Sequence, residues 1–174
     1  MTIPENVTIT RIDAAVLEGT RPRTIGRNSH VDVHGRVASD PVVRLHTDQG
    51  VTGWGWSRAT AEDAEALAGK NLHEVFAAAD GTADDYLAFD FPLWDLAGRQ
   101  ANLPVHKLLG GFRDRVPAYL TEASCSHEEA LEVAVKAKEL GYKGFKDHSM
   151  LGVEANLVLA KELRETLGDE MVLM

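Results

Sequence analysis

The sequence contains a single cysteine, Cys125, among its 174 residues. One cysteine cannot form an internal disulfide, and it also excludes a zinc site built from several thiolates. No run of about 18 apolar residues occurs, and the first residues lack the basic and apolar regions of a secretory signal. We therefore expect a cytoplasmic protein that has no membrane partner and is stabilised by side-chain packing.

The sequence also lacks a cluster of lysine and arginine residues. Its formal net charge is −9, from 27 acidic and 18 basic residues that are spread along the chain. A nucleic-acid partner is disfavoured, because such binding depends on several basic side chains that neutralise phosphates. With 44% hydrophobic residues, the chain is long enough for one domain plus part of another.

The first half of the chain shows strand patterns. Residues 7–18 are rich in β-branched and apolar types, which indicates a strand. Residues 42–47 alternate in the manner of a second strand, and residues 51–56 return as its partner after the turn residues at 48–50. The simplest arrangement of these segments is a three-stranded antiparallel meander.

Two other patterns complete this half. Residues 20–40 are polar, contain several arginines and histidines and have no helical period, which predicts a long loop with a functional role. Helical periodicity is present at about 61–79 and 83–101. We therefore expect an α+β domain over residues 1–112.

The second half alternates between strands and helices. Ser126 and Glu129 have the spacing of a capping box at the start of a helix, and Gly141 stands where that helix should end. Residues 153–167 predict a second amphipathic helix, closed by Gly168. Strand-like runs lie before, between and after the two helices, at residues 116–121, 142–146 and 171–174.

The order of these elements is β-α-β-α-β over residues 113–174. Their spacing of about 26 to 29 residues favours right-handed crossovers and a parallel sheet. The last apolar run coincides with the end of the sequence, and parallel strands are normally covered on both sides, so we expect further strands to be missing. Periodicity alone does not decide between a barrel and a small doubly wound sheet.

Several segments in fixed order resemble the mandelate racemase and muconate lactonizing branch of the enolase superfamily. The segment VVRLHTDQGVTGWG (42–55) resembles that branch's hairpin, and FPLWDLAGRQANLPVHKLLGG (91–111) resembles its last capping helix and the tail that follows. RDRVPAY (113–119) and GYKGFK (141–146) resemble the segments at its first and second barrel strands. The combination is specific and covers roughly residues 7–174.

The resemblance implies an α+β capping domain followed by a truncated (β/α) TIM-type barrel, with lid loops that close the mouth of the barrel. Enzymes of this branch abstract the proton next to a substrate carboxylate, while Mg2+ holds the carboxylate and stabilises the enediolate. In the family the metal ligands are carboxylates at the ends of strands three, four and five. We therefore expect the Mg2+ ligands beyond residue 174 and assign no metal ligand to this chain.

The resemblance also indicates catalytic residues at the end of the second barrel strand. Many relatives carry Lys-x-Lys there, with the second lysine as base, whereas this sequence has Lys146 and His148. Residues two apart in a strand point to the same side, so both can face the barrel mouth while Asp147 points away. Histidine is a suitable base near neutral pH. The alternative is that His148 is a solvated loop residue.

Substrate-binding residues are expected in the two lid regions. The candidates for contacts to an anionic, hydroxylated substrate are Arg23, Asn28, His30, Trp56 and Arg58. Trp54 and Trp56 share one face of a strand, so we expect at least one of them to lie in the core. His30 and His34 have the spacing of a helical metal pair, but the valines between them argue against a helix, and no third ligand is suitably spaced.

The reaction expected from the resemblance is that of a Mg-dependent hydro-lyase, an acid-sugar dehydratase, that acts on a small carboxylate. A racemase or cycloisomerase of the same branch is the nearest alternative. A different class is a non-catalytic binding module that keeps the lid without the chemistry. When complete, the protein is expected to be a homo-oligomer, and the present chain alone is expected to be inactive.

Overall fold

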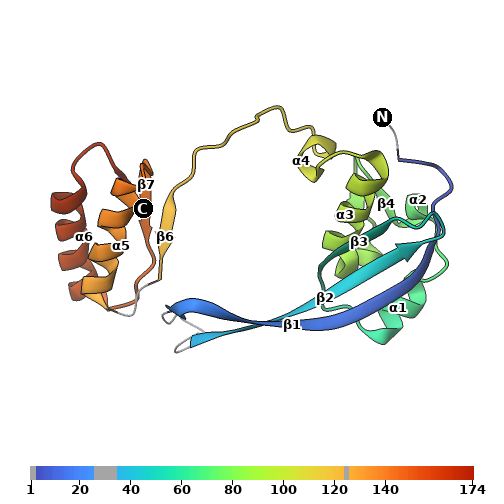
Figure 1. Ribbon diagram of the computed structural model, residues 1–174, viewed down its shortest axis with the longest axis horizontal. Coiled ribbons are helices and arrows are strands. Elements are labelled where there is room, and N and C mark those ends of the chain that lie inside the picture. The colour runs from blue at the N-terminus through green and yellow to red at the C-terminus, as the bar shows by residue number, and fades with distance from the viewer. Residues whose placement is uncertain (1–2, 26–34, 124–125) are drawn as a thin grey trace. The chain divides into compact units, whose positions relative to one another are not determined.

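The computed structural model describes residues 3–25, 35–123 and 126–174 (Figure 1). The chain divides into two compact units. The first contains Met1–Glu18 and Ser39–Arg113, and the second contains Gly19–Ala38 and Asp114–Met174. Among the described residues, no helix combines the length and apolar character needed to cross a membrane.

The first unit contains the main part of a three-stranded sheet in the order β1-β2-β3, and the parts of β1 and β2 within Gly19–Ala38 belong to the second unit. Its strands are β1 (Ile9–Ile25), β2 (Gly35–Thr47) and β3 (Thr52–Trp56). Strands β2 and β3 are antiparallel, with Val43 opposite Gly55 and Leu45 opposite Gly53. This confirms the predicted meander. The helices and short strands that follow are α1 (Ala61–Leu67), α2 (Leu72–Val75), β4 (Phe76–Ala77), β5 (Gly81–Thr82), η1 (Asp84–Phe89), α3 (Asp90–Ala101) and α4 (Val105–Leu108).

The predicted loop over residues 20–40 is wrong for the residues that the structure describes. Residues 20–25 continue β1, and residues 35–40 belong to β2. Arg21 Nη1 donates to the Val37 carbonyl at 2.6 Å, and Arg36 Nε donates to the Arg21 carbonyl at 3.1 Å. Most side chains of this two-stranded ribbon are exposed, so the alternation of apolar and polar residues that identifies a half-buried strand is absent.

The predicted helix at 61–79 is also wrong beyond its first two turns. Helix α1 ends at Leu67, and Gly69 has a φ of +82°. The next residues pair with the start of the chain: Gly69 N–H donates to the Ile9 carbonyl at 2.8 Å, and Leu72 N–H donates to the Val7 carbonyl at 2.8 Å. This pairing replaces helix hydrogen bonds, and the chain resumes as the single-turn helix α2 and the β4-β5 hairpin.

Helix α3 covers the inner face of the sheet and approaches β3 very closely. A Cβ atom at Gly53 would lie 2.5 Å from both the Leu96 Cβ and the Pro92 carbonyl oxygen, and one at Gly55 would lie 2.7 Å from the Phe91 Cβ. The strand therefore has room only for glycine on this face. The core beneath α3 is formed by apolar side chains of the sheet and the helices: Val7, Ile9, Val43, Leu45, Leu67, Leu72, Val75, Phe76, Phe89, Leu93, Leu96 and Ala97.

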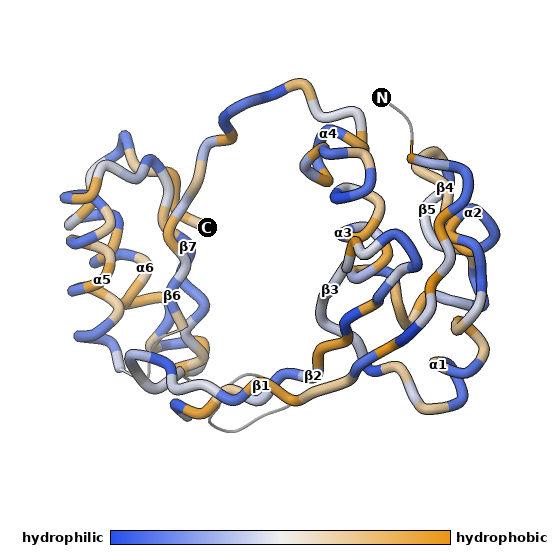
Figure 2. The backbone as a smooth tube through the Cα atoms, turned by 45° about the vertical axis from the view of Figure 1, so that its right-hand side comes forward, coloured by the Kyte–Doolittle hydropathy of each residue, from blue (hydrophilic) through white to orange (hydrophobic). Residues whose placement is uncertain are grey.

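The C-terminal part of the second unit has the predicted β-α-β-α-β order. Its elements are β6 (Leu120–Glu122), α5 (His127–Glu139), β7 (Gly144–Asp147), α6 (Val153–Leu167) and β8 (Val172–Leu173). The strands are parallel in the order β6-β7-β8. Hydrophobic and hydrophilic residues alternate along both helices (Figure 2). The buried residues of this region come from α5, α6 and the strands: Ala130, Ala134, Ala137, Phe145, Leu159, Leu163, Leu167 and Met171.

Local signals explain this agreement. The Ser126 hydroxyl accepts a hydrogen bond from the Glu129 N–H at 3.2 Å and so caps the start of α5, as the sequence predicts. Gly141 has a φ of +85° after the last turn of α5, and Gly168 has a φ of +77° after α6. Glycine occupies this conformation without the steric penalty of a side chain, so it ends each helix.

Candidate active site

The candidate site lies at the carboxyl ends of the parallel strands β6, β7 and β8. In parallel sheets these ends meet at one edge, where α/β proteins place their functional groups. Strand β7 carries Lys146, and His148 is the first residue after its end. On the neighbouring strand β6, Thr121 is the register partner of Lys146, and Glu122 is the register partner of Asp147.

Strand alternation separates the two faces of β7. Phe145 is fully buried against α5 and α6, and Asp147 lines the same helix-facing hollow together with Asn156 of α6. Lys146 therefore points to the opposite face, where it is partly exposed, and His148, two residues later, is exposed just beyond the strand. Lys146 lies on the face away from the helices and Asp147 on the face toward them, as the sequence pattern predicts. The catalytic roles of Lys146 and His148 remain predictions.

The backbone around His148 is held by both neighbouring strands. The His148 N–H donates to the Glu122 carbonyl at 2.8 Å, and the Asp147 N–H donates to the Met174 carbonyl at 2.9 Å. The sheet ladder thus extends one residue past the end of β7. His148 is therefore an exposed residue directly after the strand, with its backbone N–H bonded to β6.

Two acidic residues at this edge were not singled out by the sequence as site residues. Glu122, at the end of β6, is 1% exposed, and its Oε1 accepts a hydrogen bond from the Ala123 N–H at 2.9 Å. Asp147 is its register partner, so both carboxylates are directed to the helix side of the sheet. Mg2+ prefers several converging carboxylate oxygens, and the described residues include no group of three His, Cys, Asp or Glu side chains that could hold a metal ion. The part of the chain that the structure describes does not form a magnesium site.

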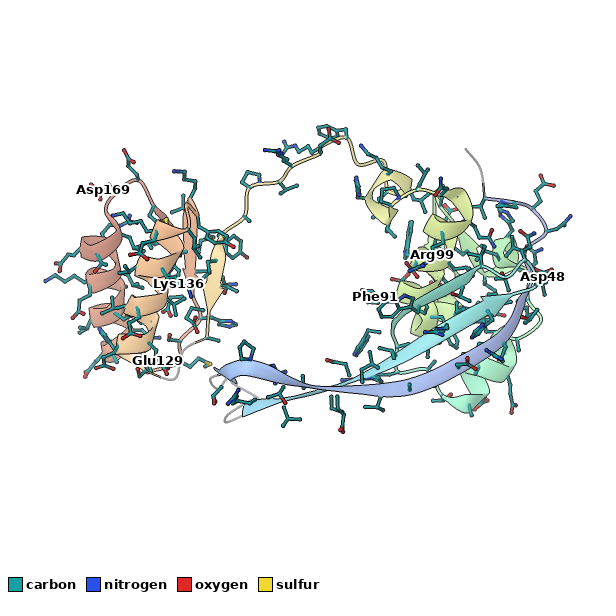
Figure 3. All side chains as sticks on the ribbon, in the orientation of Figure 1. Asp48, Phe91, Arg99, Glu129, Lys136 and Asp169 are labelled. Carbon is teal, nitrogen blue, oxygen red and sulfur yellow. The ribbon has the colours of Figure 1, made fainter. Side chains whose placement is uncertain are left out.

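The lid candidates are only partly visible. Asn28, His30 and His34 lie outside the described residues, as does the side chain of Arg23. Trp56 ends β3, and the guanidinium carbon of Arg58 lies 5.1 Å from the centre of its ring. The Trp56 ring also meets the Phe91 ring edge to face, with 6.4 Å between ring centroids and 78° between planes. Phe91 lies at the start of α3 (Figure 3). The two lid candidates Trp56 and Arg58 therefore form one cation–π pair.

The expectation that Trp54 or Trp56 lies in the core is wrong. Trp54 is 50% exposed and Trp56 is 42% exposed. Both occupy the outer face of β3, because the inner positions Gly53 and Gly55 lie against α3 where no side chain fits. The outer face of the sheet also carries Arg44, opposite Trp54. A small residue at every second position is the sequence signal from which this orientation follows.

Sequence relatives of the chain are epimerases and dehydratases; no family model matches it. It is 27% identical over 156 residues to the L-Ala-D/L-Glu epimerase of Clostridium acetobutylicum, a match that covers 76% of this chain and 44% of the epimerase. It is 32% identical over 87 residues to the arabinonate dehydratase of Saccharolobus solfataricus, which covers 47% of this chain and 23% of the dehydratase. The chain thus spans less than half of each.

Solved structures show the same relationship. A mandelate racemase/muconate lactonizing protein from Geobacillus sp. Y412MC10, complexed with magnesium/tartrate, superposes with a TM-score of 0.79 at 24% identity and covers 99% of this chain and 51% of that one. A galacturonate dehydratase from Geobacillus sp., complexed with D-galacturonate and 5-keto-4-deoxy-D-galacturonate, has a TM-score of 0.76 at 25% identity, with 99% and 51% covered.

The fold and the relatives define the class of protein. It has a three-stranded antiparallel sheet with helices, followed by the β-α-β-α-β start of a barrel, as in about half of each matched structure. The relatives of this chain in sequence and fold are mandelate racemase and enolase superfamily enzymes, which confirms the resemblance seen in the sequence.

Proposed function

We propose that this chain contributes the capping domain, residues 1–112, and the first strands of the barrel, residues 113–174, to a Mg-dependent enzyme that removes the α-proton of a carboxylate substrate. The observation that supports the proposal is that Lys146 lies on the face of β7 opposite the buried Phe145, with His148 exposed directly after the end of the strand. We refer below to this chain joined to the remaining barrel strands as the complete enzyme.

In the proposed reaction His148 is the general base. Its imidazole accepts the α-proton, and the positive charge of Lys146 on the same face favours the negative charge that develops on the carboxylate oxygens. When bound, Mg2+ supplies the further electrostatic stabilisation that an α-proton of such low acidity requires. Because its ligands would come from residues beyond 174, we propose that the 174-residue chain alone has no activity.

We propose an acid sugar as the substrate and dehydration as the outcome. The base removes the α-proton, the β-hydroxyl leaves as water, and the resulting enol becomes a 2-keto acid. Two relatives support this choice: the arabinonate dehydratase, and the galacturonate dehydratase complexed with a sugar acid. Arg58 supplies a cation and the neighbouring Trp56 supplies a ring face, and both suit an anionic, hydroxylated ligand.

Racemisation or epimerisation is the second candidate, because the match to the L-Ala-D/L-Glu epimerase covers more of this chain than the match to the dehydratase does. Both reactions begin with the same proton abstraction. They differ in the fate of the enediolate, which loses a β-hydroxyl in one and regains a proton on the opposite face in the other. Mass spectrometry of the product separates them, because only dehydration removes the mass of water.

The test is α-proton exchange with deuterated solvent in the complete enzyme. We expect His148→Asn to slow this exchange about 100- to 10,000-fold, while substrate still binds, because asparagine approximates the size of histidine but cannot accept the proton. His106→Asn is the matched control, since His106 is an exposed residue of α4 in the other unit. If His148→Asn exchanges the α-proton at the parent rate, the base lies on another strand. If the parent enzyme shows no exchange, the alternative of a non-catalytic binding module is favoured.

A further inference from the structure

The segment between β7 and α6 is fixed by side chains from both ends. Asp147 Oδ1 accepts a hydrogen bond from the Ser149 N–H at 2.9 Å. From the other end, Asn156 Oδ1 accepts from the Leu151 N–H at 3.2 Å, and Asn156 Nδ2 donates to the Ser149 carbonyl at 3.3 Å. These three bonds tie residues 149–151 to the strand before them and to the helix after them.

The start of α6 has no side-chain cap of the usual kind. Its N-cap is Gly152, which has a φ of +101° and no side chain to accept a hydrogen bond from the first turn. Asn156, in the first turn of the helix, instead turns its amide toward the preceding segment. Its contacts therefore serve the segment that precedes the helix, and this segment begins at His148.

Asp147 and Asn156 reach His148 only through the backbone. Both line the helix-facing hollow beside Phe145, whereas His148 follows Lys146 on the opposite face. The His148 N–H is bonded to the Glu122 carbonyl, and the next N–H, that of Ser149, is bonded to the Asp147 carboxylate. The main chain is thus held at the base residue and immediately after it, which leaves the imidazole its side-chain torsions as the main remaining freedom.

We infer that Asp147 and Asn156 are positioning residues for His148, and this inference rests on the proposed function of that histidine. They hold the strand end so that the imidazole is already aimed when substrate binds. A base misplaced by about 1 Å can lose about two orders of magnitude in rate. A loss of positioning should therefore lower kcat and the exchange rate while KM stays nearly constant, because neither side chain lies on the proposed substrate face.

The decisive variants differ in which hydrogen bond they keep. Asp147→Asn retains an oxygen that can accept from the Ser149 N–H, whereas Asp147→Ala removes it. In the complete enzyme we expect Asp147→Ala and Asn156→Ala to lower α-proton exchange about 10- to 100-fold with KM within about twofold, and Asp147→Asn to restore most of the rate. Lys161→Ala is the control on α6. The Lys161 side chain is 77% exposed, and its ion pair with the exposed Glu165 is long, at 3.9 Å.

Backbone amide exchange gives a second readout that does not depend on activity. The Leu151 amide should lose protection in Asn156→Ala, and the Ser149 amide should lose protection in Asp147→Ala, because each loses its acceptor. Both substitutions should leave helix α5 unchanged. Asn156→Asp keeps the acceptor for Leu151 and loses the donor to the Ser149 carbonyl, so it provides a milder variant if the alanine variant does not fold. We expect its rate to fall between those of the parent and Asn156→Ala.

The outcomes separate this inference from the proposed function. If His148→Asn exchanges the α-proton at the parent rate, the proposed base is wrong. If His148→Asn is slow but Asn156→Ala and Asp147→Ala keep the parent kcat although their segment amides are unprotected, the base is correct and the positioning role is overturned. Equal losses in Asp147→Asn and Asp147→Ala would overturn the role assigned to the hydrogen bond of Asp147.

Discussion

The Asp95 carboxylate on helix α3 accepts a hydrogen bond from the Trp54 N–H on strand β3 at 2.9 Å, and the same oxygen accepts from Arg99 Nε at 2.7 Å. Strand β3 is an edge of the described sheet, so its outward N–H groups have no strand partner. Asp95 thereby satisfies one of them and binds the helix to the sheet.

Replacement of Asp95 should weaken this link. We expect Asp95→Ala to lower the free energy of unfolding by about 1 to 2 kcal/mol, measured by urea denaturation, because the Trp54 N–H loses its acceptor. Asp95→Asn keeps an oxygen in place and should cost less. An equal loss in both variants would show that the charge beside Arg99, rather than the bond to Trp54, provides the stability.

The close contact between β3 and α3 gives a sharper prediction. Gly53→Ala should destabilise the protein by about 1 to 3 kcal/mol or more, because the added methyl group meets Leu96 and the backbone of Pro92. Gly19→Ala is the matched control: a Cβ there meets nothing within 4 Å, and a change within about 0.5 kcal/mol is expected. Thermal unfolding of the two variants provides the comparison. Similar melting temperatures would contradict the packing described for α3.

A small charged cluster on the outer face of the sheet predicts a pH effect. The pKa of Asp13 is lowered from its usual value, chiefly by its hydrogen bond with His46, at 2.7 Å, and then by the charge of Arg11. The deprotonated form of Asp13 is therefore favoured in the folded protein. Its contribution to stability is present above the unfolded pKa and is lost as the pH falls through the lower, folded value.

Titration of the Asp13 carboxyl carbon by NMR tests this cluster. His46→Ala should raise the pKa of Asp13 toward its ordinary value, and Arg11→Gln should raise it less, because the hydrogen bond from His46 is the larger cause. A larger rise in Arg11→Gln than in His46→Ala would reverse the assignment.

The cap of α5 offers a local test in the second unit. Ser126→Ala should destabilise this unit by about 1 kcal/mol, because the Glu129 N–H loses its acceptor. The pKa of Glu128 is lowered by a hydrogen bond to its own backbone and, second, by one from Ser126, so the substitution should raise it only in part. The stability loss is measured by unfolding monitored with circular dichroism, and the pKa change of Glu128 is measured by NMR titration. An unchanged stability would show that the cap is replaced by solvent.

Short-range signals account for what the sequence predicted correctly. The Ser126 cap and the glycines at 141 and 168 mark helix ends through contacts within a few residues, so the β-α-β-α-β order follows from local chemistry. The resemblance then selected a barrel over a doubly wound sheet. Alternation along β7 also predicted that Lys146 and Asp147 lie on opposite faces.

Long-range pairing accounts for what the sequence did not predict. Residues 69–72 leave the helical pattern because they bond to residues 7–9, which lie 60 to 65 positions earlier, and no local signal reports that contact. The sequence did not predict the extension of β1 and β2 for a different reason. Most side chains of this ribbon are exposed, so it has no apolar face that would produce an alternating pattern. The role of Asn156 in holding residues 149 and 151 required the atomic positions of its amide.

The alternation of glycine and tryptophan in β3 has a consequence for folding. A shift of one residue in the pairing of β2 and β3 would turn Trp54 or Trp56 toward α3, at positions where even one methyl group collides with the helix. The misaligned hairpin therefore cannot accept the helix, and it gains none of the burial that α3 provides. We therefore expect helix α3 to dock only on hairpins whose strands are correctly aligned.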